Sequence, residues 1–168
     1  MQEIYQKTIC NPVSFEGIGL HSGKKSKITI MPGESDQGIK FKRVDLKQNN
    51  LILANYKNVS SAKLCTTLEN KHGVKVSTVE HLLAALYIAG IDNVTVEMDN
   101  EEVPIMDGSA KDFLDILKNI EIKTLTKKRK YLKILEKLEL IDGERKISIE
   151  PTESSFEVDF QLNYENKI

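Results

Sequence analysis

Apolar and polar residues alternate along much of the first hundred residues, which is the pattern of β-strands that bury one face. Residues 7–30 show this alternation with glycines between the apolar positions, as in FEGIGLHSGKKSKITI, and predict short strands joined by tight turns. Further strands are predicted at residues 38–43, 63–68 and 93–98. The chain therefore opens with a β-rich region.

A first helix is expected over about residues 78–89, followed by Gly90 at the position where helices commonly end. Ser77 and Glu80 have the spacing of a capping box at its start. Its apolar residues form one stripe and also occupy the side that carries His81, so we expect both sides to be covered. The stripe contains Val79, Leu82, Leu83, Leu86 and Ala89, and the second side contains Ala84 and Ile88.

A second helix is predicted after Asp107, which we expect to act in the turn and at the helix start rather than as a metal ligand. Its apolar residues recur at helical spacing and are Phe113, Leu114, Leu117 and Ile120. Strands followed by helices predict an α+β fold. We expect a two-layer sandwich in which the β-sheet carries two helices on one face.

The polar segment at residues 123–130 (KTLTKKRK) is expected to be a linker, so that residues 1–125 form the first α+β domain and residues 126–168 belong to a second, similar one. The second part is expected to contain a hairpin with a type I′ turn at Asp142-Gly143, followed by a strand at residues 156–162. No helix follows to cover the apolar face of these strands. This predicts that the second domain is truncated.

The composition, 40% hydrophobic and 29% charged residues, is that of a globular protein. Lys and Arg number 24 against 25 Asp and Glu, and no basic, aromatic-bearing face indicates a nucleic-acid partner. Neither a signal peptide nor an apolar run of about 20 residues is present, so we expect a cytoplasmic location without a stable membrane anchor. Cys10 and Cys65 belong to no CxxC motif and are expected to be free thiols.

Glu80 and His81 are the strongest candidates for functional residues in the chain, because two ionisable side chains are adjacent in the first turn of a predicted helix. The local pattern is more typical of a capping-box glutamate and a hydrogen-bonded core histidine than of a functional pair. The local sequence leaves both interpretations open.

Several longer segments carry a family resemblance. STVEHLLAAL (77–86), GIDN (90–93) and VPIMDGSA (103–110) occur in the order and at about the spacing of the UDP-3-O-acyl-N-acetylglucosamine deacetylase family, the zinc-dependent hydrolases of lipid A synthesis. GIGLHSGKK (17–25) and LCT (64–66) resemble two further segments of this family. The resemblance covers essentially the whole chain and corresponds to the N-terminal portion of those enzymes.

The resemblance implies a role for each matching residue. His81 corresponds to a ligand of the catalytic zinc ion (Zn2+), and Glu80 to the general base. Leu64, Cys65 and Thr66 correspond to substrate-binding positions, and His21 to the periphery of the site. The implied substrate is UDP-3-O-acyl-N-acetylglucosamine, which is hydrolysed to acetate and a free amine.

The family's other zinc ligands come from a helix of its second domain, which would follow Ile168. The implied partner is therefore the missing C-terminal half of the same enzyme, and the chain by itself is expected to be inactive. A noncatalytic α+β binding or regulatory module, or a gene remnant, is the alternative interpretation.

Overall fold

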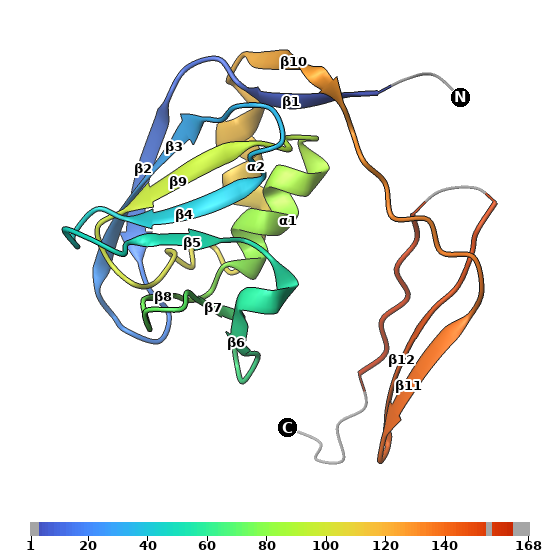
Figure 1. The fold of residues 1–168 in the computed structure, drawn as a ribbon. Helices are drawn as coiled ribbons and strands as arrows, with labels where there is room; N and C mark the ends of the chain where they lie inside the picture. Colours follow the sequence, from blue (N-terminus) through green and yellow to red (C-terminus); the bar gives the residue numbers. More distant parts are fainter. Residues whose placement is uncertain (1–3, 154–155, 163–168) are drawn as a thin grey trace. The chain divides into compact units, whose positions relative to one another are not determined.

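The computed structural model describes residues 4–153 and 156–162 and has a mixed α+β fold with few helices and several sheets (Figure 1). The chain divides into two compact units, residues 1–129 and residues 130–168. The α+β class expected from the sequence is confirmed.

The largest sheet lies in the first unit and has the strand order β2-β3-β9-β4-β5. Strand β4 runs parallel to β9, and the other neighbouring strands are antiparallel. Ile30, Phe41 and Val96 are fully buried at paired positions on neighbouring strands. The alternation in the sequence therefore places one face of this sheet in the core. The strands are β2 (Val13–Ile18), β3 (Lys25–Pro32), β4 (Ile39–Arg43), β5 (Leu51–Leu53) and β9 (Val94–Met98).

Two helices, α1 (Glu80–Ile88) and α2 (Lys111–Lys118), lie on the same side of this sheet and contact each other (Figure 1). Their buried residues belong to the same apolar core as the sheet and are Leu82, Ala85, Leu86, Phe113 and Leu117. Phe113 also packs edge-on against Phe15, with 5.5 Å between the ring centroids. The helices thus cover the apolar face of the strands.

Two smaller sheets complete the first unit. One contains β6 (Val59–Ser61), β7 (Thr67–Glu69) and β8 (Lys75–Val76), and a 3-10 turn, η1 (Tyr56–Asn58), precedes β6. In the other, β1 (Tyr5–Ile9) pairs antiparallel with β10 (Ile122–Lys128). The linker expected at residues 123–130 is therefore wrong over most of its length, because its backbone pairs with the N-terminal strand.

The end of β10 is tied to the region after α1 by Arg129. Its Nη2 donates to the Gly90 carbonyl oxygen and to Asp92 Oδ2, each at 2.8 Å. Asp92 Oδ2 also accepts the backbone N–H of Lys7 at 2.8 Å. These contacts hold both strands of the small sheet to the unit as far as residue 129.

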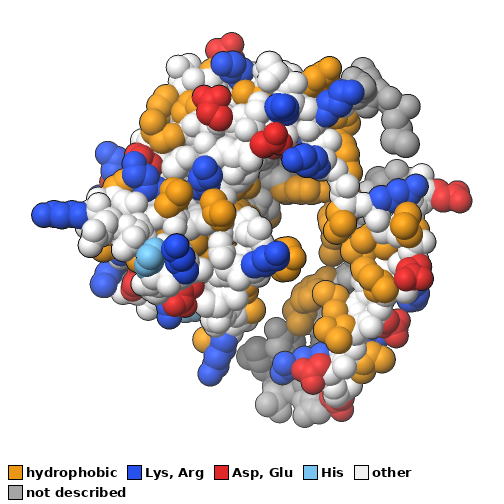
Figure 2. Space-filling view, in the orientation of Figure 1, with side chains coloured by type: hydrophobic (Ala, Val, Ile, Leu, Met, Phe, Trp, Pro, Cys, Tyr) orange, Lys and Arg blue, Asp and Glu red, His pale blue; other side chains and the backbone are white. Residues whose placement is uncertain are grey.

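The second unit contains the predicted hairpin, formed by β11 (Leu138–Asp142) and β12 (Arg145–Ile149). Its loop is Gly143-Glu144, and only Gly143 has positive φ, which is typical of a type II′ turn rather than the expected type I′ turn. One face of the hairpin is apolar and exposed, as Figure 2 shows for this unit, and contains Leu138, Leu140, Ile147 and Ile149.

The strand predicted at residues 156–162 is wrong, because these residues form neither helix nor strand. Their alternating pattern is present, but no strand accompanies it in the described part of this segment. The expected boundary between two domains, at residue 125, falls inside β10. The division of the chain into these two domains stays a prediction.

We expect trypsin to cut the native chain first between Lys130 and Lys137. Residues 130–137 form neither helix nor strand, and Lys130, Lys133 and Lys137 are exposed. Lys127 and Lys128 are instead held in the β10 pairing. Mass spectrometry of early digestion products should show a fragment that ends at Lys130, Lys133 or Lys137. First cleavage at Lys123 or Lys127 would contradict this expectation.

Candidate active site at the start of helix α1

The predicted capping box is absent from the start of α1. Val79 is the N-cap residue and makes no side-chain cap hydrogen bond. Thr78 has a φ of 57°, so the chain bends between Ser77 and the helix. The Ser77 hydroxyl donates to the Glu101 carbonyl oxygen at 3.4 Å, and its backbone N–H donates to the same oxygen at 2.8 Å. Glu80 is therefore not a capping-box acid.

The Glu80 carboxylate instead holds the segment that precedes β7. Glu80 Oε2 accepts the backbone N–H of Thr66 at 3.1 Å, and the Thr66 carbonyl oxygen accepts the backbone N–H of Val79 at 3.4 Å. Two hydrogen bonds thus join Thr66 to the first turn of α1. Glu80 Oε1 has no hydrogen-bond partner among the described residues.

Of the expected substrate-binding residues Leu64, Cys65 and Thr66, these bonds bring Thr66 next to Glu80. Leu64 has a φ of 66°, and its side chain is 84% exposed. Cys65 is a half-buried free thiol whose Sγ lies 3.8 Å from Thr67 Oγ1. The strand predicted at residues 63–68 is therefore wrong for residues 63–66, where the backbone turns toward α1.

His81 is half-buried and lies on the less buried side of α1. The neighbouring helical positions Ala84, Tyr87 and Ile88 are exposed, and Ile88 is 64% accessible. The expected apolar stripe is buried at Leu82 and Leu86. The second apolar side, next to His81, is open within this unit.

No group of three or more His, Cys, Asp or Glu side chains that could hold a metal occurs among residues 4–153 and 156–162. A catalytic zinc site usually has three protein ligands and a water. The imidazole of His81 has the chemistry for one of these positions, because it is a half-buried nitrogen donor. The described residues do not contain a complete set of zinc ligands.

The His21 side chain is exposed, whereas its backbone reaches a buried carboxylate. Glu102 Oε1 accepts the backbone N–H of His21 at 2.9 Å and the Thr78 hydroxyl at 3.0 Å. Glu102 Oε2 accepts the backbone N–H of Ser22 at 2.7 Å. The His21 turn and the bend before α1 therefore meet at one side chain.

Glu102 was not identified by its sequence, which presents it and Glu101 as two equivalent acidic residues before Val103. Only Glu102 is buried, with 2% of its surface exposed. Burial works against its ionisation, but hydrogen bonds from the His21 and Ser22 backbone and from the Ser22 and Thr78 hydroxyls hold its pKa below the ordinary value. The only feature of the local sequence that hints at burial of Glu102 is its position immediately before the apolar Val103.

Asp107 has the structural role expected from the sequence. Its Oδ1 accepts both the backbone N–H and the hydroxyl of Ser109, each at 2.9 Å. The Ser109 hydroxyl oxygen then accepts the backbone N–H of Lys111, the first residue of α2. The Ser109 backbone N–H is the largest contribution that lowers the pKa of Asp107.

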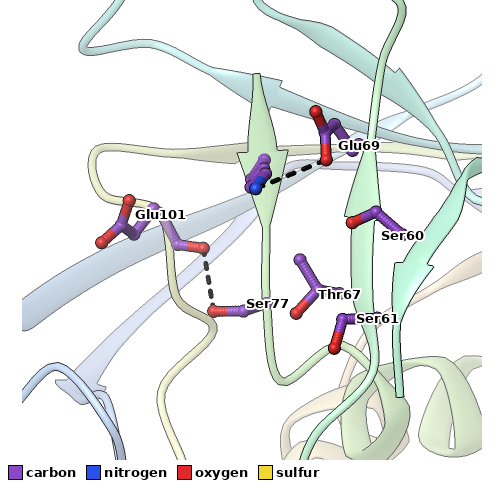
Figure 3. A pocket seen from close by; sticks show the side chains of 7 residues that line it. Ser60, Ser61, Thr67, Glu69, Ser77 and Glu101 are labelled. Atoms are coloured by element: carbon purple, nitrogen blue, oxygen red, sulfur yellow. Dashed lines mark hydrogen bonds and ion pairs between the residues drawn. The ribbon is translucent and has the colours of Figure 1, made fainter. Parts of the chain in front are cut away.

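A polar cavity of about 350 Å³ lies beside the β6-β7-β8 sheet (Figure 3). Its charged residues include Glu69 and Lys75, which form an ion pair at 3.4 Å. Its hydroxyl groups come from Ser60, Ser61, Thr67 and Ser77. Neither Glu80 nor His81 lines this cavity, so it is distinct from the first turn of α1.

These features define a mixed α+β unit with an adjacent carboxylate and imidazole on a partly open helix. The family model described as UDP-3-O-acyl N-acetylglycosamine deacetylase matches residues 6–168. Because this match covers nearly the whole chain, the chain belongs to that family. No helix in the described part of the chain is long and apolar enough to cross a membrane.

Curated relatives agree with this assignment. The chain is 41% identical over 164 residues to the UDP-3-O-acyl-N-acetylglucosamine deacetylase of Geotalea uraniireducens, covering 98% of this chain and 53% of the relative. It is 42% identical over 161 residues to the protein of the same name from Citrifermentans bemidjiense, covering 96% of this chain and 52% of the relative. The chain therefore spans about half the length of these relatives.

Proposed function

We propose that the chain contributes the general base and one zinc ligand to a deacetylase that removes the N-acetyl group of UDP-3-O-acyl-N-acetylglucosamine in lipid A synthesis. The products are acetate and the free amine. One observation carries the proposal: in a chain of this family, Thr66 fixes the carboxylate of Glu80, the residue that precedes the half-buried His81 in the first turn of α1. We further propose a cytoplasmic location.

Glu80 is placed to accept a proton. Its Oε2 is occupied by the Thr66 N–H, which orients the carboxylate, whereas Oε1 is available to a water molecule. A carboxylate within hydrogen-bond reach of the attacking water takes its proton as the water attacks the amide carbonyl. The Thr66 contact supports this role because it restricts the carboxylate to one orientation.

His81 is the proposed zinc ligand. Bound zinc would polarise the acetamide carbonyl and lower the pKa of an attacking water. Leu64, Cys65 and Thr66 would line the substrate site next to the base, and His21 would lie at its periphery. The direct bonds between Thr66 and the first turn of α1 support this placement.

The remaining ligands are proposed to come from the C-terminal half that the relatives possess. Residues 126–168 would then begin a second domain that is similar to the first and incomplete in this chain. The exposed apolar face of the β11-β12 hairpin supports this arrangement, because such a face is normally covered. The alternative is a noncatalytic α+β module or a gene remnant, and the lack of a group of three candidate metal ligands among the described residues is compatible with it.

The decisive experiment joins this chain to the C-terminal half of the Geotalea uraniireducens relative, fused or supplied in trans. The assembled protein is assayed for acetate release from UDP-3-O-acyl-N-acetylglucosamine. Turnover with zinc supports the proposal. A folded, zinc-loaded assembly without turnover would favour the noncatalytic module.

Zinc retention provides a separate test. After dialysis we expect the chain alone to retain little zinc and the assembled protein to retain about one ion, because three protein ligands are the usual minimum for a catalytic site. His81→Ala should abolish retention and turnover in the assembly. His72→Ala, at an exposed loop position, is the matched control and should change neither. Full zinc retention by assembled His81→Ala would remove His81 from the ligand set.

A further inference from the structure

We propose that the buried Glu102 carboxylate is a positioning residue for Glu80 and His81, because it holds the bend at Thr78 from which their helix begins. The expected effect of Glu102 on turnover rests on the proposed function. Its effect on the start of α1 does not, because it involves only residues of this chain. Glu102 would act through α1 and not through contact with the substrate.

The bend at Thr78 is an unfavourable conformation that requires support. Threonine is β-branched, and its φ of 57° lies in the left-handed region that such residues rarely adopt. Thr78 is 2% exposed, and its hydroxyl donates to Glu102 Oε1 at 3.0 Å. Because α1 starts two residues later, the conformation of Thr78 sets the direction of the turn that carries Glu80.

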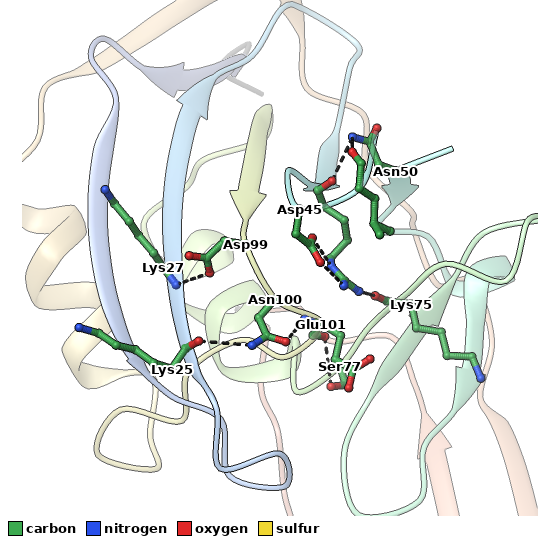
Figure 4. A network of polar contacts seen from close by, with 11 residues as sticks. Lys25, Lys27, Asp45, Asn50, Lys75, Ser77, Asp99, Asn100 and Glu101 are labelled. Carbon is green, nitrogen blue, oxygen red and sulfur yellow. Dashed lines mark hydrogen bonds and ion pairs between the residues drawn. The ribbon is translucent and has the colours of Figure 1, made fainter. Parts of the chain in front are cut away.

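The segment that carries Glu102 is anchored independently of the Glu102 side chain (Figure 4). Asp99 Oδ1 accepts the backbone N–H of Lys27 at 2.7 Å, and Asn100 Nδ2 donates to the Lys25 carbonyl oxygen at 3.3 Å. The Glu101 carbonyl oxygen accepts the Ser77 backbone N–H at 2.8 Å. The Glu102 carboxylate thus reaches Thr78 from a segment after β9 whose preceding residues are hydrogen-bonded to β3 and to Ser77.

The Glu102 carboxylate also binds the turn that contains His21. A Cβ added to Gly19 would lie 2.4 Å from Glu102 Oε2, so the turn can approach this closely only with glycine. The backbone N–H groups of His21 and Ser22 then complete the hydrogen bonding of Glu102. A change at Glu102 is therefore transmitted both to the helix start and to the His21 turn.

Amide hydrogen exchange in the intact chain tests the structural part directly. The Thr66 amide reports the position of Glu80, since it donates to Glu80 Oε2. In Glu102→Gln, an NH2 group replaces one acceptor oxygen and opposes the Ser22 N–H, and the remaining bonds lose their charged acceptor. We expect Thr66 to exchange faster by about 10-fold or more, as for the loss of one hydrogen bond to a charged group. Glu80→Ala gives the value for a free Thr66 amide. Val96, in the centre of the sheet, should be unchanged.

Glu101→Gln is the matched control, because it makes the same change at the exposed neighbouring residue and should leave Thr66 protected. Parent-like protection of Thr66 in folded Glu102→Gln would overturn the inference. If Glu102→Gln does not fold, the exchange of the Thr66 amide in Thr78→Val and in Thr78→Ser tests the same inference. Valine removes the hydroxyl donor and should expose Thr66, whereas serine keeps the donor and should protect it. Equal protection in both would also overturn the inference.

Turnover provides the functional readout in the protein joined to its C-terminal half. Misplacement of the base should lower kcat in Glu102→Gln by a larger factor than it raises KM, because the base acts in the transition state whereas Thr66 and the His21 turn only border the substrate. An unchanged kcat would overturn the catalytic part of the inference. Absence of turnover in the parent assembly would count against the proposed function, and the exchange of Thr66 would still decide the role of Glu102.

Discussion

Glu80→Gln should reduce deacetylation by the assembled enzyme roughly 100- to 10,000-fold, the usual contribution of a positioned general base. The glutamine carbonyl oxygen can still accept the Thr66 N–H, so the bond that joins α1 to residue 66 is retained. The amide nitrogen that replaces the second oxygen cannot accept a proton from water. The substitution therefore separates proton transfer from the structural role of this side chain.

The measurement is kcat, made together with zinc content and Thr66 amide exchange. Both of the latter should match the parent protein. Glu121→Gln, at an exposed position outside the site, is the control for the same chemical change and should keep the parent rate. A Gln variant at residue 80 that hydrolyses substrate at close to the parent rate would show that Glu80 only anchors Thr66.

Phe41→Ala should lower the free energy of unfolding of the first unit by about 3 to 5 kcal/mol. Phe41 is fully buried on β4, where it pairs with Val96 on one side and Ile52 on the other. Removing the Phe41 ring leaves a cavity in the apolar core that the sheet shares with α1 and α2. This loss is a large part of the about 5 to 15 kcal/mol that stabilises a typical domain.

Urea unfolding followed by circular dichroism provides the measurement. Phe160→Ala is the matched control, since it removes the same ring from a side chain that is 76% exposed in the second unit. We expect it to change the unfolding free energy by no more than about 0.5 kcal/mol. Equal effects of the two substitutions would contradict the assignment of Phe41 to the core.

The main sheet could be predicted from the sequence because it buries a single face. Strands β3 and β9 alternate buried and accessible residues, and β9, with Val94, Val96 and Met98 buried, shows this most clearly. The helices were found for a related reason, since their buried residues recur at helical spacing. Where burial imposes a period on the chain, the order of apolar and polar residues is enough to predict the helix or strand.

Strand β10 could not be predicted in this way. Its sequence, IKTLTKK, places only Leu125 in a half-buried position, so its hydrogen bonding to β1 leaves almost no hydrophobic pattern. Residues 156–162 show the opposite case, with a clear alternating pattern that is not accompanied by a strand. Strand formation depends on pairing as well as on burial, and pairing involves distant residues.

The candidate site was located by Glu80 and His81 and by the LCT segment, but its internal connections were not. The capping-box prediction failed because Thr78 adopts a conformation that its residue type disfavours. Glu102 was missed because its partners, His21 and Thr78, are distant in sequence. Local rules cannot identify contacts that depend on the completed fold.

The pairing of β1 with β10 also determines the order of events during synthesis. Tyr5 is opposite Lys128, so the first strand cannot be completed until the main sheet, both helices and β10 have been translated. At about 5 to 20 residues per second, this delay lasts roughly 6 to 25 s. Throughout that time β1 is an unpaired edge on the nascent chain, available to chaperones or to other nascent chains.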